Sequence, residues 1–130
     1  MRFHHDAPPF CRNASNQIST CSSSLRYKTN IAPFQSGLNL VNRLQPITFN
    51  WRANNHADLG FGAEDVAKIE PLLVTYNERG EVEGVKYDRV AVVLLNAVKE
   101  QQAQIKQQQT LIEDLRRLIC SQNVQADVCK

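Results

Sequence analysis

The sequence has little net charge and no long apolar run. It holds 15 Lys and Arg residues against 13 Asp and Glu residues, a formal net charge of +2 over 130 residues. Because these charges are spread along the chain, no strong attraction to nucleic acid or to an anionic membrane is expected. No apolar segment approaches the roughly 20 residues of a membrane-spanning helix, and residues 1–10 lack the apolar core of a signal peptide. The sequence therefore predicts neither nucleic acid nor membrane as a partner.

The four cysteines lack the close spacing of a metal site. Cys11 and Cys21 form one local pair, and Cys120 and Cys129 form another. Neither pair has the C-x-x-C spacing of a zinc site, and the histidines do not complete one, so we expect no metal and no other cofactor. Two short disulfide loops are the favoured interpretation, which indicates an oxidising compartment or a particle surface. Four free thiols are the alternative.

Residues 1–22 carry little apolar pattern. Asn13, Ser15 and Asn16 are turn-forming residues between the first two cysteines, which predicts a hairpin at this place. We interpret the segment as the remnant of an upstream parent region.

Residues 23–90 predict a small α+β unit with antiparallel strand pairing. The expected elements are helices over 38–44 and 64–69, strands over 47–51, 72–76 and 82–87, and a turn at 77–80. Four aromatic residues are expected in the core of this unit: Phe49, Trp51, Phe61 and Tyr87. Gly60 and Gly62 could supply an oxyanion donor, but tight backbone packing explains them as well.

Residues 89–120 contain neither proline nor glycine, and Asp88 is expected to be the N-cap of a long helix. Its seams repeat every seven residues, with Ala91, Val98, Ile105, Ile112 and Ile119 in one and Leu94, Gln101, Gln108 and Leu115 in the other. This heptad pattern predicts a coiled coil over 91–120 and a tail over 121–130. Isoleucine in the first seam and glutamine in the second favour a trimer, with a dimer as the alternative. A helix packed only on its own domain is disfavoured, because the glutamine-rich stretch 101–109 could not hold a monomeric helix alone.

The run Cys-Ser-Ser-Ser-Leu-Arg-Tyr-Lys at residues 21–28 places a lysine close to consecutive serines. A serine needs a base to become a nucleophile, and a lysine serves as that base only when it has lost its proton. Burial favours this loss, because desolvation disfavours the charged form. Serine and lysine lie this close by chance in most proteins, so the spacing alone favours a solvated polar loop.

A series of ordered blocks is more specific than the serine run. The blocks are Ser-Ser-Leu-Arg-Tyr-Lys-Thr-Asn-Ile at 23–31, Leu-Gln-Pro-Ile-Thr-Phe-Asn-Trp at 44–51, Gly-Phe-Gly-Ala-Glu-Asp-Val at 60–66, Pro-Leu-Leu-Val at 71–74, Val-Lys-Tyr-Asp-Arg at 85–89 and Asn-Ala-Val-Lys-Glu-Gln at 96–101. Together they resemble the C-terminal intramolecular chaperone domain of phage endosialidase tailspikes. That domain is a self-cleaving Ser–Lys peptidase, also found in other phage tail fibres, bacterial surface proteins and myelin regulatory factor. The resemblance runs from residue 23 to about residue 118.

The resemblance implies that Ser23 is the nucleophile and Lys28 the base, and that the cut falls between Ser22 and Ser23. The residue after the nucleophile is commonly Asp or Asn in this family, and here it is Ser24. Ser24 and His56 could line the site, although a solvated loop histidine is the favoured interpretation of His56. Five residues apart, Ser23 and Lys28 would lie on opposite faces of a straight strand. We therefore expect them to meet across a turn or bulge, or between neighbouring chains.

The expected fold is α+β: a small antiparallel sheet with short helices, followed by a long C-terminal helix that forms a trimeric coiled coil. The resemblance implies a homotrimer that helps an upstream fibrous parent polypeptide to assemble in register and then releases itself. A trimerisation cap that never cleaves is the alternative, and a nucleic-acid-binding regulator is disfavoured because no basic patch is visible. A phage tail or a bacterial cell surface is the expected location.

Overall fold

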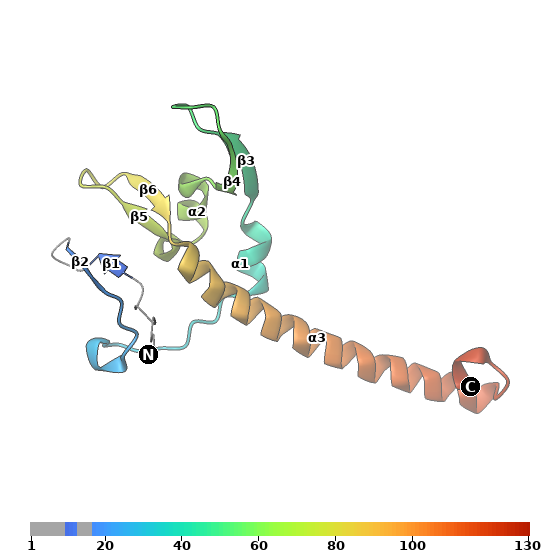
Figure 1. Cartoon of the computed structure of the whole chain (residues 1–130). Coiled ribbons are helices and arrows are strands. Elements are labelled where there is room, and N and C mark those ends of the chain that lie inside the picture. Colours follow the sequence, from blue (N-terminus) through green and yellow to red (C-terminus); the bar gives the residue numbers. More distant parts are fainter. Residues whose placement is uncertain (1–9, 13–16) are drawn as a thin grey trace, which may run out of the picture. The chain divides into compact units, whose positions relative to one another are not determined.

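The structure, a computed structural model, describes residues 10–12 and 17–130 of the chain. The chain divides into two compact units, Met1–Phe34 and Gln35–Lys130. Short helices and antiparallel strand pairs precede one long C-terminal helix (Figure 1). The predicted α+β class is therefore confirmed.

The first unit holds a disulfide-closed hairpin and one helical turn. Its elements are strands β1 (Phe10–Arg12) and β2 (Ile18–Thr20) and the 3-10 turn η1 (Leu25–Tyr27). The two strands pair antiparallel, as predicted. The predicted disulfide joins Cys11 to Cys21, whose Cα atoms are 5.0 Å apart. The predicted turn residues, at 13–16, lie outside the described residues.

The second unit contains the remaining elements, in which pairs of strands alternate with helices. They are α1 (Leu38–Arg43), β3 (Pro46–Asn50), β4 (Ala57–Phe61), α2 (Ala63–Ile69), η2 (Pro71–Leu73), β5 (Val74–Tyr76), β6 (Val82–Val85), α3 (Tyr87–Gln122) and η3 (Asp127–Cys129). Strands β3 and β4 pair antiparallel, as do β5 and β6, but each pair is a separate two-stranded sheet. Strand β4 falls in a stretch where no strand was predicted. The strand predicted over 72–76 begins only at Val74, because Pro71–Leu73 forms a 3-10 turn.

A small aliphatic core holds the second unit together. It consists of Leu40, Val66, Leu73, Val74, Val90 and Val93, contributed by α1, α2, η2, β5 and α3. The predicted aromatic core is wrong for Trp51 and Tyr87, which are 53% and 54% exposed. Phe61 is half-buried and packs against the aliphatic core, and Phe49 is half-buried. Phe49 meets Trp51 edge-on with ring centroids 5.1 Å apart, and Phe61 stacks on Tyr87 at 5.9 Å.

Gly60 is buried against the ring of Tyr87. The hydroxyl of Tyr87 accepts a hydrogen bond from the backbone N–H of Phe61 at 3.0 Å, and a Cβ at Gly60 would overlap that hydroxyl. Gly62 has more room, since a Cβ there would meet only the flexible Asp65 carboxylate, at 3.3 Å. Tight backbone packing is therefore sufficient to explain Gly60.

Replacing Gly60 with alanine is expected to lower the free energy of unfolding by about 1–3 kcal/mol, the usual cost of forcing extra volume into a packed site. Urea unfolding monitored by circular dichroism measures it. Gly62→Ala is the matched control and should change stability by no more than about 0.5 kcal/mol. Combining Gly60→Ala with Tyr87→Phe should cost less than the two single changes together, because the overlapping hydroxyl is gone. Additive costs would show that the Tyr87 hydroxyl is not the obstacle.

Helix α3 begins earlier than predicted. Its N-cap is Lys86, without a side-chain hydrogen bond, so the prediction of Asp88 as N-cap is wrong. Asp88 instead lies in the first helical turn, where a carboxylate favours the positive end of the helix dipole, and it pairs with Arg89 at 3.2 Å. The helix ends at Gln122, and the predicted disulfide joins Cys120 to Cys129, with their Cα atoms 5.7 Å apart. Within the described ranges, no helix is both long and apolar enough to span a membrane.

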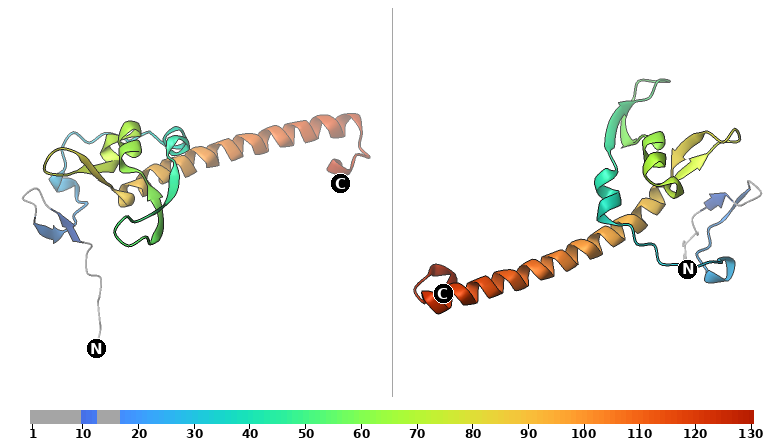
Figure 2. Two further views of the ribbon diagram at one scale, coloured as in Figure 1. Left: turned by 90° about the horizontal axis from the view of Figure 1, so that it is seen from above. Right: turned by 180° about the vertical axis from the view of Figure 1, so that it is seen from behind.

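The two faces of α3 differ in burial. Val90, Val93 and Ala97 are buried on the face that packs on the rest of the second unit. Leu94 and Val98, from the two predicted seams, are 46% and 59% exposed. From residue 101 to residue 119 every side chain is exposed, and both views of Figure 2 show α3 continuing past α1 and α2. The helix thus packs on its own unit with one face and leaves the predicted seams open.

Candidate functional site

The serine run forms a compact turn. Ser24 is the N-cap of η1, and its Oγ accepts hydrogen bonds from the backbone N–H of Arg26 at 3.3 Å and from Arg26 Nε at 3.2 Å. At the other end, the backbone N–H of Lys28 donates to the carbonyl of Leu25 at 3.1 Å. Serine is a favoured residue at this position because its hydroxyl satisfies an N–H that has no partner within the turn. These bonds reverse the chain direction between Ser24 and Lys28.

This turn brings the lysine back to one particular serine. Lys28 Nζ donates a hydrogen bond to Ser23 Oγ over 3.2 Å. A 3-10 turn has about three residues, so it supplies the reversal that a straight strand lacks. The two residues that the sequence predicts as nucleophile and base therefore lie in hydrogen-bonding contact within one chain.

The three serines have three different partners. Ser22 Oγ accepts from the backbone N–H of Ser24 at 3.2 Å, across the bond at which the cut is predicted. Ser24 Oγ is occupied by Arg26, and Ser23 Oγ meets Lys28. Within residues 21–28, all of which the structure describes, the amine of Lys28 thus forms its hydrogen bond with the middle serine, Ser23. Ser22 instead holds the backbone on either side of the Ser22–Ser23 bond.

The contact between Ser23 and Lys28 is exposed to solvent in the single chain. In the observed bond the nitrogen is the donor, whereas a general base must accept the serine proton through a free lone pair. Removal of water around the amine favours that neutral form. Residues 25–28 are all exposed, so this short turn does not shield the amine of Lys28 from water. Contacts from outside the turn must exclude that water.

His56 and Gly62, which the sequence also offered as site residues, belong to the second unit. His56 is exposed in the loop between β3 and β4, where its backbone N–H donates to Asn54 Oδ1 at 3.1 Å and its carbonyl accepts from the backbone N–H of Trp51 at 2.9 Å. These contacts account for its position as a loop residue. Gly62 is the N-cap of α2, and its carbonyl accepts from the N–H groups of Asp65 and Val66 at 3.1 Å.

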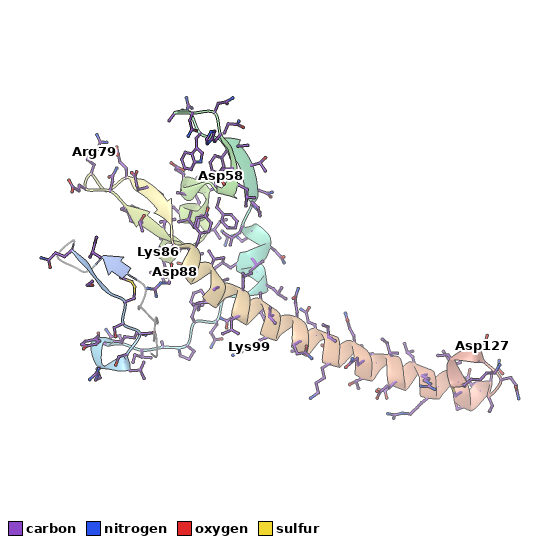
Figure 3. The ribbon with its side chains drawn as sticks, in the orientation of Figure 1. Asp58, Arg79, Lys86, Asp88, Lys99 and Asp127 are labelled. Carbon is purple, nitrogen blue, oxygen red and sulfur yellow. A yellow bond between two sulfur atoms is a disulfide. The ribbon has the colours of Figure 1, made fainter. Side chains whose placement is uncertain are left out.

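Asp58 lies on β4, in the β3–β4 hairpin, and was not predicted from the sequence to have a role. Its carboxylate accepts from the Leu59 N–H at 2.8 Å and from Trp51 Nε1 at 3.1 Å (Figure 3). These two hydrogen bonds, first the one from Leu59 and then the one from Trp51, hold the pKa of Asp58 below its ordinary value. Their effect is to orient the indole of Trp51 on β3. In the described part of the chain, no group of three or more His, Cys, Asp or Glu side chains could hold a metal ion.

Comparison with protein families supplies the decisive observation. Residues 23–75 match the model of a peptidase family described as "Chaperone of endosialidase". This segment belongs to that family. The match begins at Ser23, the residue that contacts Lys28. No curated protein matches the chain in sequence.

The family assignment supports a role for this endosialidase-type chaperone domain as an intramolecular chaperone. The family also carries a peptidase name, which indicates a domain of the self-cleaving serine peptidase type. Two features of the chain agree with this type of domain. A serine and a lysine are in contact at the start of the matched segment, and a long helix with an open apolar stripe follows it.

Proposed function

We propose that this chaperone domain assembles as a homotrimer and then cuts its own chain between Ser22 and Ser23. Ser23 is the nucleophile and Lys28 is the base. The observation that carries the proposal is the 3.2 Å contact between Lys28 Nζ and Ser23 Oγ, at the first residue of the family match. The cut separates an upstream fibrous parent, which a phage tail or bacterial surface would carry, from the chaperone.

The proposed reaction has two steps. Neutral Lys28 takes the hydroxyl proton of Ser23, whose Oγ attacks the carbonyl carbon of Ser22. The carbon–nitrogen bond breaks, the new N-terminal amine of Ser23 takes up the proton, and an ester joins Ser22 to Ser23 Oγ. Water, deprotonated by Lys28, then attacks the ester. The products are a carboxylate at Ser22 and the restored hydroxyl of Ser23.

The proposed trimer rests on the open seams of α3. Val98, Ile105, Ile112 and Ile119, all in the first seam, are 59%, 47%, 63% and 45% exposed in the single chain. Such a stripe is stable in water when equivalent helices cover it, and β-branched residues in one seam with glutamine in the other favour more than two helices. Because every side chain from residue 101 to residue 119 is exposed, this part of the stripe is free to pair.

A second candidate is a trimerisation cap that never cleaves. The exposure of Ser23 and Lys28 in the single chain favours it, because a solvated lysine is a poor base. The state of the Ser22–Ser23 bond in the assembled trimer distinguishes the two candidate functions. A cap leaves the Ser22–Ser23 bond intact in the trimer, whereas a peptidase breaks it.

Mass spectrometry of the purified chain tests the proposal. We expect a fragment that begins at Ser23 and a complementary fragment that ends at Ser22. An intact Ser22–Ser23 bond in a stable trimer would support the non-cleaving cap instead.

The fragments are expected to separate without reductant. The Cys11–Cys21 disulfide lies wholly before the cut, and the Cys120–Cys129 disulfide lies wholly after it. Electrophoresis under non-reducing conditions should therefore show the same fragments as under reducing conditions. Fragments that part only after reduction would mean that the cysteines pair across the cut.

A further inference from the structure

The start of α1 is held by two side chains of α3. Asn96 Nδ2 donates to the carbonyl of Ser36 at 3.2 Å, and Glu100 Oε2 accepts from the backbone N–H of Leu38 at 3.1 Å. These partners are 60 and 62 residues apart in the sequence. The Leu38 N–H is one of the first amides of a helix, which have no partner inside the helix, and a carboxylate is a strong acceptor for it.

Gly37 closes the same contact. It is buried, and a Cβ there would lie 2.9 Å from the backbone nitrogen of Ala97 and 2.9 Å from the backbone carbonyl carbon of Asn96. The chain therefore lies directly on the backbone of α3. We call this contact, between residues 36–38 and residues 96–100, the α1–α3 junction.

The junction lies where α3 leaves the packed part of its unit. Ala97, at 4% exposure, belongs to the buried face, and every residue from 101 to 119 is exposed. The coiled coil would therefore begin at the junction itself, where the seam residues Leu94 and Val98 are exposed. Pairing of the open helix would also fix the turn that carries Asn96 and Glu100, since a helix transmits such order along its length.

The junction also lies close in sequence to the proposed catalytic pair. Residues 29–35 alone join Lys28 to Ser36. A change in how residues 36–38 are held therefore acts on the end of the segment that carries Lys28. A broken junction would leave that end free while the seams of α3 stay intact, because Asn96 and Glu100 are not seam residues.

We propose that Asn96 and Glu100 are positioning residues that couple assembly of α3 to self-cleavage. This inference rests on the proposed cleavage by Ser23 and Lys28. The coupling is mechanical: the trimer orders α3, the junction transfers that order to residues 36–38, and the linker places the catalytic segment. Neither side chain takes part in the chemistry.

The test is the cleavage rate of preformed trimers. Glu100→Ala should slow cleavage about tenfold or more, because it removes the partner of a partly buried backbone N–H. Asn96→Ala should slow cleavage less, because its hydrogen bond with Ser36 is exposed. Sedimentation should still show trimers for both. Glu100→Gln should recover most of the rate, since its amide oxygen can accept from the Leu38 N–H.

Two controls separate coupling from general destabilisation. Lys99→Ala alters the same helical turn at an exposed position (Figure 3) and should leave the rate unchanged. Val93→Ala truncates a side chain that is 1% exposed on the same face of α3. It should lower the melting temperature but leave the rate per trimer near that of the unmodified protein.

The outcomes are distinguishable. Trimers of Asn96→Ala and Glu100→Ala that cleave at the normal rate would overturn the coupling and leave the Ser23–Lys28 reaction standing. A loss of cleavage that only follows loss of trimer would overturn it too. Trimers that still cleave after Ser23→Ala would overturn the proposed function, and the coupling with it.

Discussion

Replacing Ser23 with alanine is expected to abolish cleavage between Ser22 and Ser23, and replacing Lys28 should do the same. Nucleophile and base act as a unit, so each single change should cost about as much as both together, on the order of a thousandfold or more in rate. Mass spectrometry of chains incubated as trimers measures the fragment that begins at residue 23.

Lys28→Arg is the sharpest variant of this experiment. Arginine keeps the positive charge and can still donate to Ser23 Oγ, but it does not lose its proton in proteins. If the 3.2 Å contact between Lys28 and Ser23 had only a structural role, arginine would preserve it. If Lys28 is the base, arginine would remove that base. We therefore expect Lys28→Arg to be as inactive as Lys28→Ala.

Ser22→Ala is the matched control among the serines. Its hydroxyl accepts from the Ser24 N–H and does not meet the lysine, so the nucleophile and the base remain in place. We expect cleavage to continue, at a reduced rate if the Ser22 bond helps to hold the backbone. A fragment beginning at residue 23 from the Ser23→Ala protein would refute the assignment of the nucleophile.

Replacing Ile105 with aspartate is expected to convert the trimer to a monomer and to stop cleavage. Ile105 lies in the first seam and is 47% exposed in the single chain. In the proposed coiled coil it would face its equivalents, where three carboxylates would cost on the order of several kcal/mol unless the helices part. Sedimentation and a cleavage time course, run in parallel, measure both effects.

The loss of cleavage follows from the exposure of the Ser23–Lys28 contact. If assembly supplies the dry surroundings that favour a neutral amine, a monomer leaves Lys28 solvated although the residue itself is unchanged.

Gln107→Asp is the control for the added charge. It introduces the same single negative charge at an exposed position outside both seams, so trimer and cleavage should persist. A monomeric Ile105→Asp protein that cuts at the normal rate would show that one chain builds the complete site. A monomeric unmodified chain at micromolar concentration would rule out the trimer.

Local patterns in the sequence were sufficient to predict most elements. The heptad repeat without proline or glycine predicted the helix that the structure shows as Tyr87–Gln122, and the cysteine spacing predicted both disulfides. Turn-forming residues predicted the hairpin of β5 and β6. These features depend on residues close in sequence, and their periodicity is therefore visible without a fold. The family, too, follows from ordered local blocks and is confirmed over residues 23–75.

Burial and long-range contacts were decided by the tertiary structure. The alternation around Trp51 predicted a strand, but not that the β3–β4 pair would stand as a separate two-stranded sheet with this side chain 53% exposed. Similarly, Asp88 has the character of an N-cap, yet the helix begins one residue before it. A side chain's burial depends on what other elements pack against it, and no local pattern contains that information.

The candidate site divides in the same way. The resemblance to the chaperone family implied Ser23 and Lys28 as its residues, and their spacing implied the need for a turn between them. The structure decided that the turn is η1, capped by Ser24, and that Ser23 rather than its neighbours meets the amine. It alone revealed Glu100, because a contact with Leu38 across 62 residues forms only when α1 packs on α3.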